Sequence, residues 1–340
     1  MAEIRALPWN GYKVASTFSG GGGSSTGYKM AGYRVVWASE FIPAAQDTYR
    51  ANHPNTILDT RDIRAVTAAD ILRATGLREG ELDLFDGSPP CASFSTAGKR
   101  EAGWGTVKNY SDTKQRTDDL FFEFSRLVRG LRPKVFVAEN VSGLVKGTAK
   151  GYFKLILADL KAAGYRVEAQ VLDAQWLGVP QARQRLIFVG VRDDLGVAPA
   201  HPSPLPYRYT VRDALGLAPL QFEAEAESDI SRFAIGREWD KLKPGEQSSK
   251  FFSLVRPSLD GPSPCVTQLG GNASVAGVTH PTERRKFSIA ELRRICGFPD
   301  DYVLTGSYTQ QWERCGRAVP PVMMAAVAAT IRDRVLARCS

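Results

Sequence analysis

The sequence predicts an α/β protein built around a parallel sheet. Short apolar runs that read as strands alternate with helix-like segments over about the first 190 residues, and this alternation is typical of parallel strands joined by helical crossovers. Composition is the second observation, because 43% of the 340 residues are hydrophobic, 24% are charged and no long apolar run or repeat is present. These values indicate a globular protein with a full core and no membrane-spanning segment.

The expected elements follow in order along the chain. An apolar strand at 13–18, a tight glycine turn at 20–23 and a short helix at 24–31 form the first unit. The helix near 118–131 opens with two acidic residues, as the helix dipole favours, and the helix at 153–163 is closed by Gly164. The remaining strands are expected at 33–39, 82–85, 135–138 and 186–191, and the remaining helices at 43–52 and 67–75.

The alternation of strands and helices stops after Arg192. A Pro-rich connection follows, and no strand–helix alternation resumes before about residue 285. Ser288 and Glu291 then form a capping box that opens a helix, and an Ala-rich helix begins at Pro321. We therefore expect a first domain over 1–193, a smaller domain over 194–284, and a final segment over 285–340 that returns to the first domain.

Charge and cysteine usage narrow the class of protein. The formal net charge of +8 fits an anionic partner, although it does not by itself identify one. The first residues lack the layout of a secretory signal, so we expect a cytoplasmic protein whose five cysteines stay reduced.

The glycine turn and two acids predict a ligand site. The run from Phe18 to Gly23 lies between a strand and a helix, where glycines let the backbone approach a ligand. Glu40, at the tip of the next strand, is placed to accept hydrogen bonds from ribose hydroxyls, and Asp62 could accept from an adenine amino group. Each acid could equally be a solvated loop carboxylate. Together the three sites favour an adenosine-containing ligand.

A thiol follows the strand at 82–85. Cys91 comes directly after Gly87-Ser-Pro-Pro90, at the strand end where open α/β sheets place their chemistry. A lone cysteine is more often a core residue. Two further motifs favour a nucleophile instead, namely Glu139-Asn140 after the strand at 135–138 and the run Gln181-Ala-Arg-Gln-Arg185.

With these motifs the chain resembles the cytosine carbon-5 DNA methyltransferases. Motifs similar to those of the family occur in the family's usual order from Phe18 to Pro321. Only about residues 195–255 have no counterpart among these motifs. The resemblance implies a Rossmann-like domain that binds S-adenosylmethionine, a small target-recognition domain, and a final segment that packs back on the first domain. It implies double-stranded DNA as the partner, and either a companion restriction endonuclease or a solitary enzyme. We expect a monomer on the DNA, because one chain holds every part.

The resemblance also implies a role for each catalytic residue. The Cys91 thiolate adds to carbon 6 of a cytosine that has been flipped out of the duplex, which activates carbon 5 toward a methyl sulfonium. Glu139, if protonated, donates to ring nitrogen 3, although a buried acid paired with an arginine is the alternative. Arg185 holds the cytosine carbonyl oxygen, Arg183 supports the catalytic loop, and Asn140 braces that loop.

The remaining candidate site residues fall into two groups that the resemblance implies. The loop after Cys91 is expected to close over the flipped base and to reach phosphates. No metal is expected, because Cys265, Cys296 and Cys315 lack ligand spacing. The candidate cofactor-binding residues are Phe18, Gly20, Gly22, Gly23, Glu40, Phe41, Asp62, Ile63, Ser88, Pro90, Leu120, Arg317, Ala318 and Val319, and the candidate DNA-binding residues are Ser93, Ser95, Lys99, Arg100 and Arg237.

Two positions depart from the family pattern. Arg317 stands where the family usually has Asn, beside the methionine part of the cofactor. Its guanidinium could clamp the cofactor carboxylate, or could favour carboxy-S-adenosylmethionine and carboxymethyl transfer to cytosine. Ser24 replaces an aromatic residue that commonly stacks on adenine, so Phe41 or Ile63 is expected to take that place.

Other readings stay open at the level of sequence. Transfer-RNA cytosine methylation would use the same catalytic parts, and a silent DNA-binding regulator would lack Cys91 or Glu139, which are both present. A Cys-His hydrolase is disfavoured because the three histidines, His53, His201 and His280, lie in Pro-flanked loop contexts.

Overall fold

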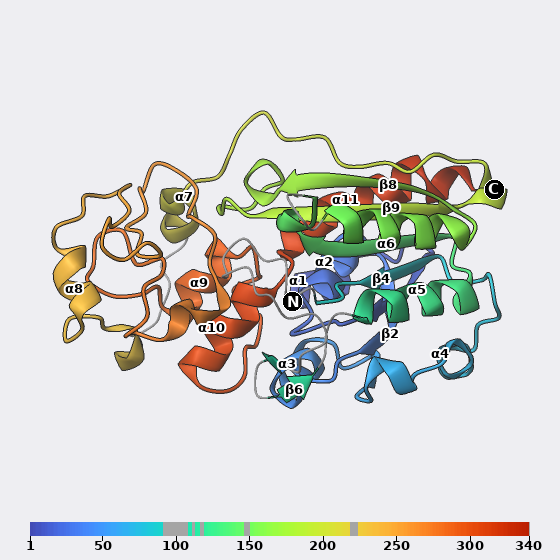
Figure 1. Cartoon of the computed structure of the whole chain (residues 1–340), viewed down its shortest axis with the longest axis horizontal. Coiled ribbons are helices and arrows are strands. Elements are labelled where there is room, and N and C mark those ends of the chain that lie inside the picture. The colour runs from blue at the N-terminus through green and yellow to red at the C-terminus, as the bar shows by residue number, and fades with distance from the viewer. Residues whose placement is uncertain (91–107, 111–112, 116–118, 146–149, 218–223, 340) are drawn as a thin grey trace.

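The computed structural model describes residues 1–90, 108–110, 113–115, 119–145, 150–217 and 224–339. Figure 1 shows an elongated molecule with two parts. We call the strands of the large sheet, with the helices that cover them, the sheet lobe. The second lobe comprises residues 211–217 and 224–317, in which short helices are joined by long irregular segments.

A seven-stranded sheet with the order β3-β2-β1-β4-β7-β9-β8 forms the centre of the sheet lobe. The five strands from β3 to β7 are parallel, whereas β9 runs antiparallel to both of its neighbours. The α/β class is confirmed, but the expectation of a wholly parallel sheet is wrong at this edge. The strands are β1 (Lys13–Thr17), β2 (Arg34–Ser39), β3 (Ile57–Asp59), β4 (Leu84–Gly87), β7 (Val135–Val141), β8 (Tyr165–Asp173) and β9 (Gln184–Arg192).

The reversal at β9 follows from the connection that precedes it. Only about ten residues separate β8 from β9, and a parallel crossover needs a dozen or more, usually with a helix. β8 is also an edge strand with exposed positions along its length, so it lacks the continuous apolar run that predicts a buried strand. A separate two-stranded antiparallel sheet, β5 (Lys108–Tyr110) with β6 (Thr113–Gln115), was likewise not expected from the sequence.

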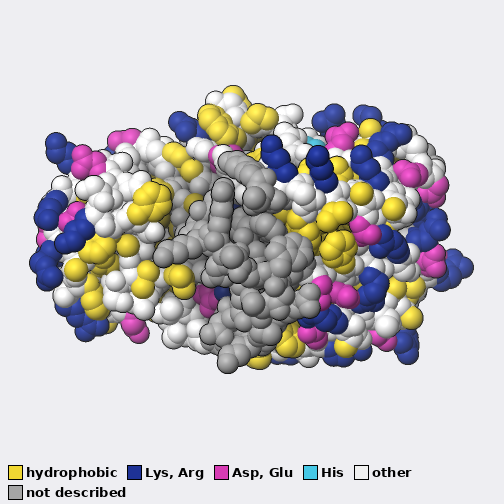
Figure 2. All heavy atoms as spheres, viewed as in Figure 1, with side chains coloured by type: hydrophobic (Ala, Val, Ile, Leu, Met, Phe, Trp, Pro, Cys, Tyr) yellow, Lys and Arg dark blue, Asp and Glu magenta, His cyan; other side chains and the backbone are white. Residues whose placement is uncertain are grey.

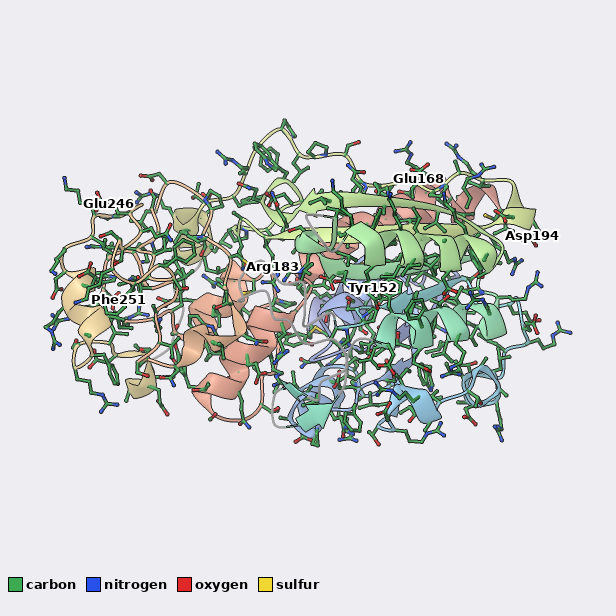
Figure 3. All side chains as sticks on the ribbon, in the orientation of Figure 1. Tyr152, Glu168, Arg183, Asp194, Glu246 and Phe251 are labelled. Carbon is green, nitrogen blue, oxygen red and sulfur yellow. The ribbon has the colours of Figure 1, made fainter. Side chains whose placement is uncertain are left out.

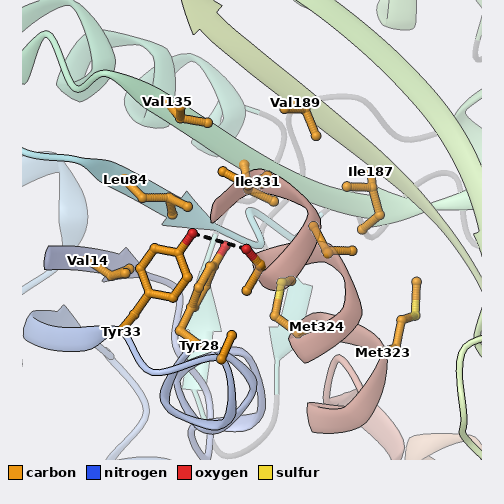
Figure 4. Close-up of a cluster of buried hydrophobic side chains, with 14 of the residues drawn as sticks. Val14, Tyr28, Tyr33, Leu84, Val135, Ile187, Val189, Met323, Met324 and Ile331 are labelled. Atoms are coloured by element: carbon orange, nitrogen blue, oxygen red, sulfur yellow. Dashed lines mark hydrogen bonds between the residues drawn. The ribbon is translucent and has the colours of Figure 1, made fainter. Parts of the chain in front are cut away.

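Helices cover both faces of the large sheet. On one face α2 (Gly23–Met30) and α11 (Pro321–Arg334) pack together, and Figure 4 shows Met323, Met324 and Ile331 of α11 beside strand residues of the same cluster. In this layer the Tyr33 hydroxyl donates to the Ala328 carbonyl at 3.0 Å. The opposite face carries α4 (Ala68–Thr75), α5 (Leu120–Leu131) and α6 (Lys150–Ala162) over a phenylalanine-rich cluster. The C-terminal helix therefore completes the core of the sheet lobe.

Two smaller apolar clusters lie mainly in the second lobe. One of them unites residues of α7, α9 and α10 with Val266 and Val278, and the other surrounds Trp239 of α8. The capping box predicted at Ser288 and Glu291 is present and opens α9. The remaining helices are α1 (Ala2–Ala6), α3 (Pro43–Asn52), α7 (Val211–Gly216), α8 (Ala234–Trp239), α9 (Ile289–Ile295) and α10 (Tyr308–Arg317).

The Pro-rich connection joins the lobes. In Figure 1 the chain leaves β9, runs back along the edge beside β8 and reaches α7. The Leu205 amide donates to the Trp176 carbonyl at 2.8 Å, which ties this segment to the loop between β8 and β9. No helix within the described ranges is long and apolar enough to cross a membrane.

Candidate active site

The glycine turn lies between β1 and α2 and has a left-handed backbone. Phe18, Gly20 and Gly22 have φ values of 53°, 54° and 93°, and such a value is costly for Phe18, as is common at ligand sites. A Cβ atom on Gly22 would lie 2.4 Å from His53 Nε2, whereas one on Gly20 would meet nothing within 4 Å. The turn is thus packed tightly beneath Gly22 and open at Gly20.

Glu40 is buried at the tip of β2 and binds this turn. Its carboxylate accepts from the Gly20 and Ile42 amides, each at 2.7 Å. Burial raises the pKa of Glu40, while these amides and the charge of Arg314 act against the rise. Each carboxylate oxygen keeps a second lone pair, so the group can still accept from a ribose hydroxyl.

The other predicted cofactor residues follow neighbouring strand ends. Asp62 caps the short 3-10 helix that begins at Ile63 and pairs with Arg64 at 3.1 Å, so its carboxylate already has a charged partner. Ile63 and Leu120 are buried, and Phe41, Ser88 and Pro90 are half-buried. The structure brings these residues to the carboxyl edge of the sheet.

The strand before the thiol ends at this same edge. β4 stops at Gly87, and the Asn140 side-chain amide donates to the Pro89 carbonyl at 3.2 Å. This bond joins the end of β7 to the segment that follows β4. Five predicted residues of this loop, Cys91, Ser93, Ser95, Lys99 and Arg100, lie outside the described residues.

Glu139 and Arg185 meet at the ends of adjacent antiparallel strands. Arg185 Nε lies 2.7 Å from Glu139 Oε1, and both side chains are largely buried. Burial lowers the pKa of Arg185, Arg183 lowers it further, and Glu139 opposes the change. Glu139 is thus paired with the residue that is predicted to hold the cytosine carbonyl oxygen.

Arg183 lies where the two lobes join, as Figure 3 shows. Its guanidinium donates to the Gly316 carbonyl at 2.8 Å and to the Val266 carbonyl at 3.0 Å, and Cys265 Sγ lies at 3.4 Å. Among the described residues Arg183 Nε has no hydrogen-bond partner. The observed bonds attach the second lobe to the sheet lobe.

Comparison with known proteins decides the family. The model of the C-5 cytosine-specific DNA methylases matches residues 12–333. The chain belongs to this family. It is 31% identical to the type II methyltransferase M1.HphI of Haemophilus parahaemolyticus, over 92% of this chain and 85% of the relative. It is 32% identical to M.PspPI of Psychrobacter sp. (strain TA137), over 97% and 81%.

Solved structures agree on the fold of this methylase. A protein described as a DNA modification methyltransferase encoded within an E. coli prophage superposes with a TM-score of 0.76 and 21% identity, over 95% of this chain and 99% of that chain. A Spodoptera frugiperda DNMT2 mutant gives a TM-score of 0.68 and 18% identity, over 92% and 97%. The methylase is thus an enzyme, a C-5 cytosine DNA methyltransferase with a Rossmann-like sheet, and the other functions that its sequence left open are not favoured.

The C-terminal motif of the methylase lies against the glycine turn. A Cβ on Gly23 would lie 2.5 Å from the Val319 carbonyl and 3.3 Å from the Ala318 side chain. Arg317 Nε binds Glu313 Oε1 at 2.7 Å, and Arg314 binds the other oxygen of Glu313 at 2.9 Å. Because Arg317 already has a carboxylate partner within its own helix, the structure gives it no special fit to a donor with a further carboxylate.

Two groups at this edge were not singled out from the sequence. Asp86, on β4, is wholly buried and accepts hydrogen bonds from two hydroxyls, although an acid inside an apolar strand was a visible signal. Tyr302 packs against His53 and donates to the Gly21 carbonyl, a contact across 281 residues that no local pattern reveals. Arg237 lies exposed on α8 in the second lobe, and the described residues contain no cluster of three or more metal-ligating side chains.

Proposed function

We propose that this methylase transfers the methyl group of S-adenosylmethionine to carbon 5 of cytosine in double-stranded DNA, with Cys91 as the nucleophile. The observation that carries the proposal is the buried Glu139–Arg185 pair on strands β7 and β9. β4, which pairs with β7, ends four residues before Cys91. An acid, a cation and a thiol are what nucleophilic activation of a pyrimidine ring requires.

Each residue then has a chemical task. The Cys91 thiolate forms a bond to carbon 6, and the electrons of the carbon 5–carbon 6 double bond move into the ring. Glu139 delivers a proton to nitrogen 3, which limits the negative charge on the ring, while Arg185 holds the carbonyl oxygen. After alkylation, loss of the carbon-5 proton returns an electron pair that expels the thiolate.

The glycine turn and Glu40 fit an adenosine-containing donor. The space beside Gly20 admits a ligand, and Glu40 offers acceptor lone pairs at the tip of β2. When bound, S-adenosylmethionine supplies an electrophilic methyl group. We propose that Phe18, Gly20, Gly22, Gly23, Glu40, Phe41, Asp62, Ile63, Ser88, Pro90, Leu120, Arg317, Ala318 and Val319 surround it, with the methyl donor preferred over its carboxylated form.

On the face drawn in Figure 2, Lys and Arg side chains are spread over both lobes with acidic side chains between them. The coloured side chains on this face therefore do not form one basic band. We propose that residues 194–284 recognise the target, that Arg237 and the loop residues Ser93, Ser95, Lys99 and Arg100 contact DNA, and that one chain acts alone.

The names of the relatives suggest a cellular setting. M1.HphI and M.PspPI are named type II methyltransferases, and we propose that this methylase likewise works beside a companion endonuclease in the cytoplasm of a bacterial or phage-infected cell.

A trapping and transfer assay tests the proposed reaction. Labelled methyl transfer is measured on duplex DNA and on transfer RNA, and covalent capture is measured on duplex DNA that contains 5-fluorocytosine, because fluorine prevents the final elimination. We expect transfer to DNA, capture by the wild type, and neither with Cys91→Ser. Glu139→Gln should lose about a hundredfold to ten-thousandfold in kcat. Full transfer by Cys91→Ser, or a preference for transfer RNA, contradicts the proposal.

A further inference from the structure

Asp86 is the penultimate residue of β4 and lies beneath the proposed cofactor site. It is directly opposite Ser16 of β1 in the sheet register, and only 1% of its surface is exposed. Ser16 Oγ donates to Asp86 Oδ2 at 2.8 Å, and Ser19 Oγ donates to Ser16 Oγ at 3.1 Å. A chain of hydroxyls thus connects the carboxyl group to the residue before the glycine turn.

Within the part of the chain that the structure describes, no cation is bonded to the Asp86 carboxyl group. Tyr28 of α2 donates to Oδ1 at 3.0 Å, and among the described residues only hydroxyls are bonded to the carboxyl group. Of the described residues, the other titratable groups that act on it or respond to it are Tyr49 of α3 and Glu139 of β7. Helix α11 contributes Met323 and Met324 to the same layer.

This environment makes Asp86 a group that changes charge near neutral pH. Burial raises its pKa to about 7, against the opposing effect of the Ser16 and Tyr28 hydrogen bonds, and Glu139 adds to the rise. In a low-dielectric interior, a unit charge placed at the strand ends would act strongly on such a group.

We propose that Asp86 senses the charge on the cofactor sulfur, being ionised while the sulfonium donor is bound and protonated once the neutral thioether product has formed. The inference rests on the proposed donor, because S-adenosylmethionine carries a positive sulfur and S-adenosylhomocysteine does not. The two ligands are alike in their adenosine and amino-acid groups and differ only at the sulfur, which in the donor carries the methyl group and the positive charge.

Linkage gives the consequence in binding. A ligand that lowers the pKa of Asp86 must release a proton when it binds, and by reciprocity its affinity depends on pH. S-adenosylmethionine affinity should fall by about tenfold for each pH unit below 7 and level off above it. The affinity for S-adenosylhomocysteine should not change over the same range. The enzyme should therefore prefer the donor over the product most strongly above neutral pH.

Calorimetry on the full chain measures this directly. Titrations with each ligand at pH 6, 7 and 8, in buffers of different ionisation enthalpy, count the protons released. We expect S-adenosylmethionine to release close to one proton at pH 6 and almost none at pH 8, and S-adenosylhomocysteine to release none. Asp86→Asn should abolish the release.

Two further variants test whether Asp86 itself is the group that releases the proton. Tyr28→Phe retains the carboxyl group but removes a hydrogen bond that lowers its pKa, so the release should persist to higher pH. Asp83→Asn is the matched control, because Asp83 is a buried acid just before β4 that is bonded to Lys134 instead, and it should leave the release unchanged.

Three results separate the possible failures. Equal proton release with both ligands, or release that survives in Asp86→Asn, overturns the role of Asp86 while leaving the proposed donor intact. Binding of both ligands without any proton release does the same. Failure of both ligands to bind overturns the proposed donor and the role of Asp86 together.

Discussion

The sheet lobe and the second lobe each bury a carboxyl group and control its charge in opposite ways. Asp86 of the sheet lobe has hydroxyl partners, and burial raises its pKa to about 7. Glu291 of the second lobe binds Arg285 at 2.7 and 2.9 Å. Burial acts to raise the pKa of Glu291, but Arg285 and His280 outweigh it and bring the value to about 2. Because burial acts to raise the pKa of both acids, the bonded partners are what separate their charges.

The difference reflects how each lobe satisfies its buried polar groups. In the sheet lobe the strand ladders pair the backbone, so the core between strands and helices is largely apolar. The second lobe has few regular elements, and long basic side chains bind its carbonyl groups. Lys286 donates to the Val275 carbonyl at 2.9 Å, and Arg256 donates to the Leu242 and Pro281 carbonyls. In the second lobe, charged side chains therefore make some of the bonds to backbone carbonyls that strand pairing makes in the sheet lobe.

The largest expected effect is on the ion pair of the second lobe. Glu291→Gln leaves Arg285 buried without its closest charge, and breaking a buried pair costs about 3–5 kcal/mol in the free energy of unfolding. Because the folded pKa of Glu291, about 2, lies below its ordinary value of 4.5, its stabilisation is present above pH 4.5 and is lost as pH falls toward 2. Urea unfolding at pH 7 and pH 3 measures both effects, and the variant should lose less than the wild type on acidification.

Glu283→Gln is the control for that experiment. Glu283 binds the same arginine at 2.8 Å, but its side chain is 59% exposed, so we expect a loss of less than about 1 kcal/mol. Equal losses in the two variants would show that burial of the pair is not what stabilises the second lobe.

Asp86 is expected to show the opposite pH dependence. Its folded pKa of about 7 lies above its ordinary value of 3.8, so its contribution to stability is fully present below pH 3.8 and is lost as pH rises through 7. Relative to Asp86→Asn, the wild type should lose about 1.4 kcal/mol for each pH unit across that window. Unfolding curves of both proteins at pH 5 and pH 8 give the difference, and parallel pH profiles contradict the assignment.

A smaller effect is expected at the glycine turn. Gly22→Ala forces a side chain into a left-handed backbone and against His53, which should cost about 1–3 kcal/mol of folding stability and weaken S-adenosylmethionine binding. Gly151→Ala is its control, because Gly151 lies in α6 with open space around it, and it should be neutral or stabilising by up to about 1 kcal/mol. Differential scanning calorimetry measures the stability of both variants, and ligand titration measures their affinity for S-adenosylmethionine. Equal stability and equal affinity in the two variants would show that the left-handed backbone at Gly22 does not matter.

The smallest effect is expected at Arg317. It pairs with Glu313 four residues earlier on α10, and such helical pairs contribute about 0.3–0.5 kcal/mol. Arg317→Asn should therefore change stability little and leave 5-methylcytosine as the product with S-adenosylmethionine. Mass spectrometry of DNA incubated with each donor tests this, since a donor preference that changes with the variant would restore a carboxylate-binding role for Arg317.

Sequence reasoning succeeded where the signal was local. The apolar runs of β1, β4 and β7, the glycine turn and the capping box at Ser288 all depend on residues within a few positions of one another. It failed at the direction of β9 and at the edge strand β8, because the partner of a strand and the exposure of its faces depend on how the sheet closes.

The sequence by itself determined the family, the order of its motifs and the residue types at the site, since each motif carries its chemistry within a short stretch. Only the tertiary structure decided which charges those residues meet. Glu139 pairs with Arg185 on the neighbouring strand, and Asp86 accepts hydrogen bonds from hydroxyls of β1 and α2. Arg183 donates to carbonyl groups of the second lobe. These partners lie between 46 and 133 residues apart in sequence, and the charge of a buried group depends on contacts that only folding creates.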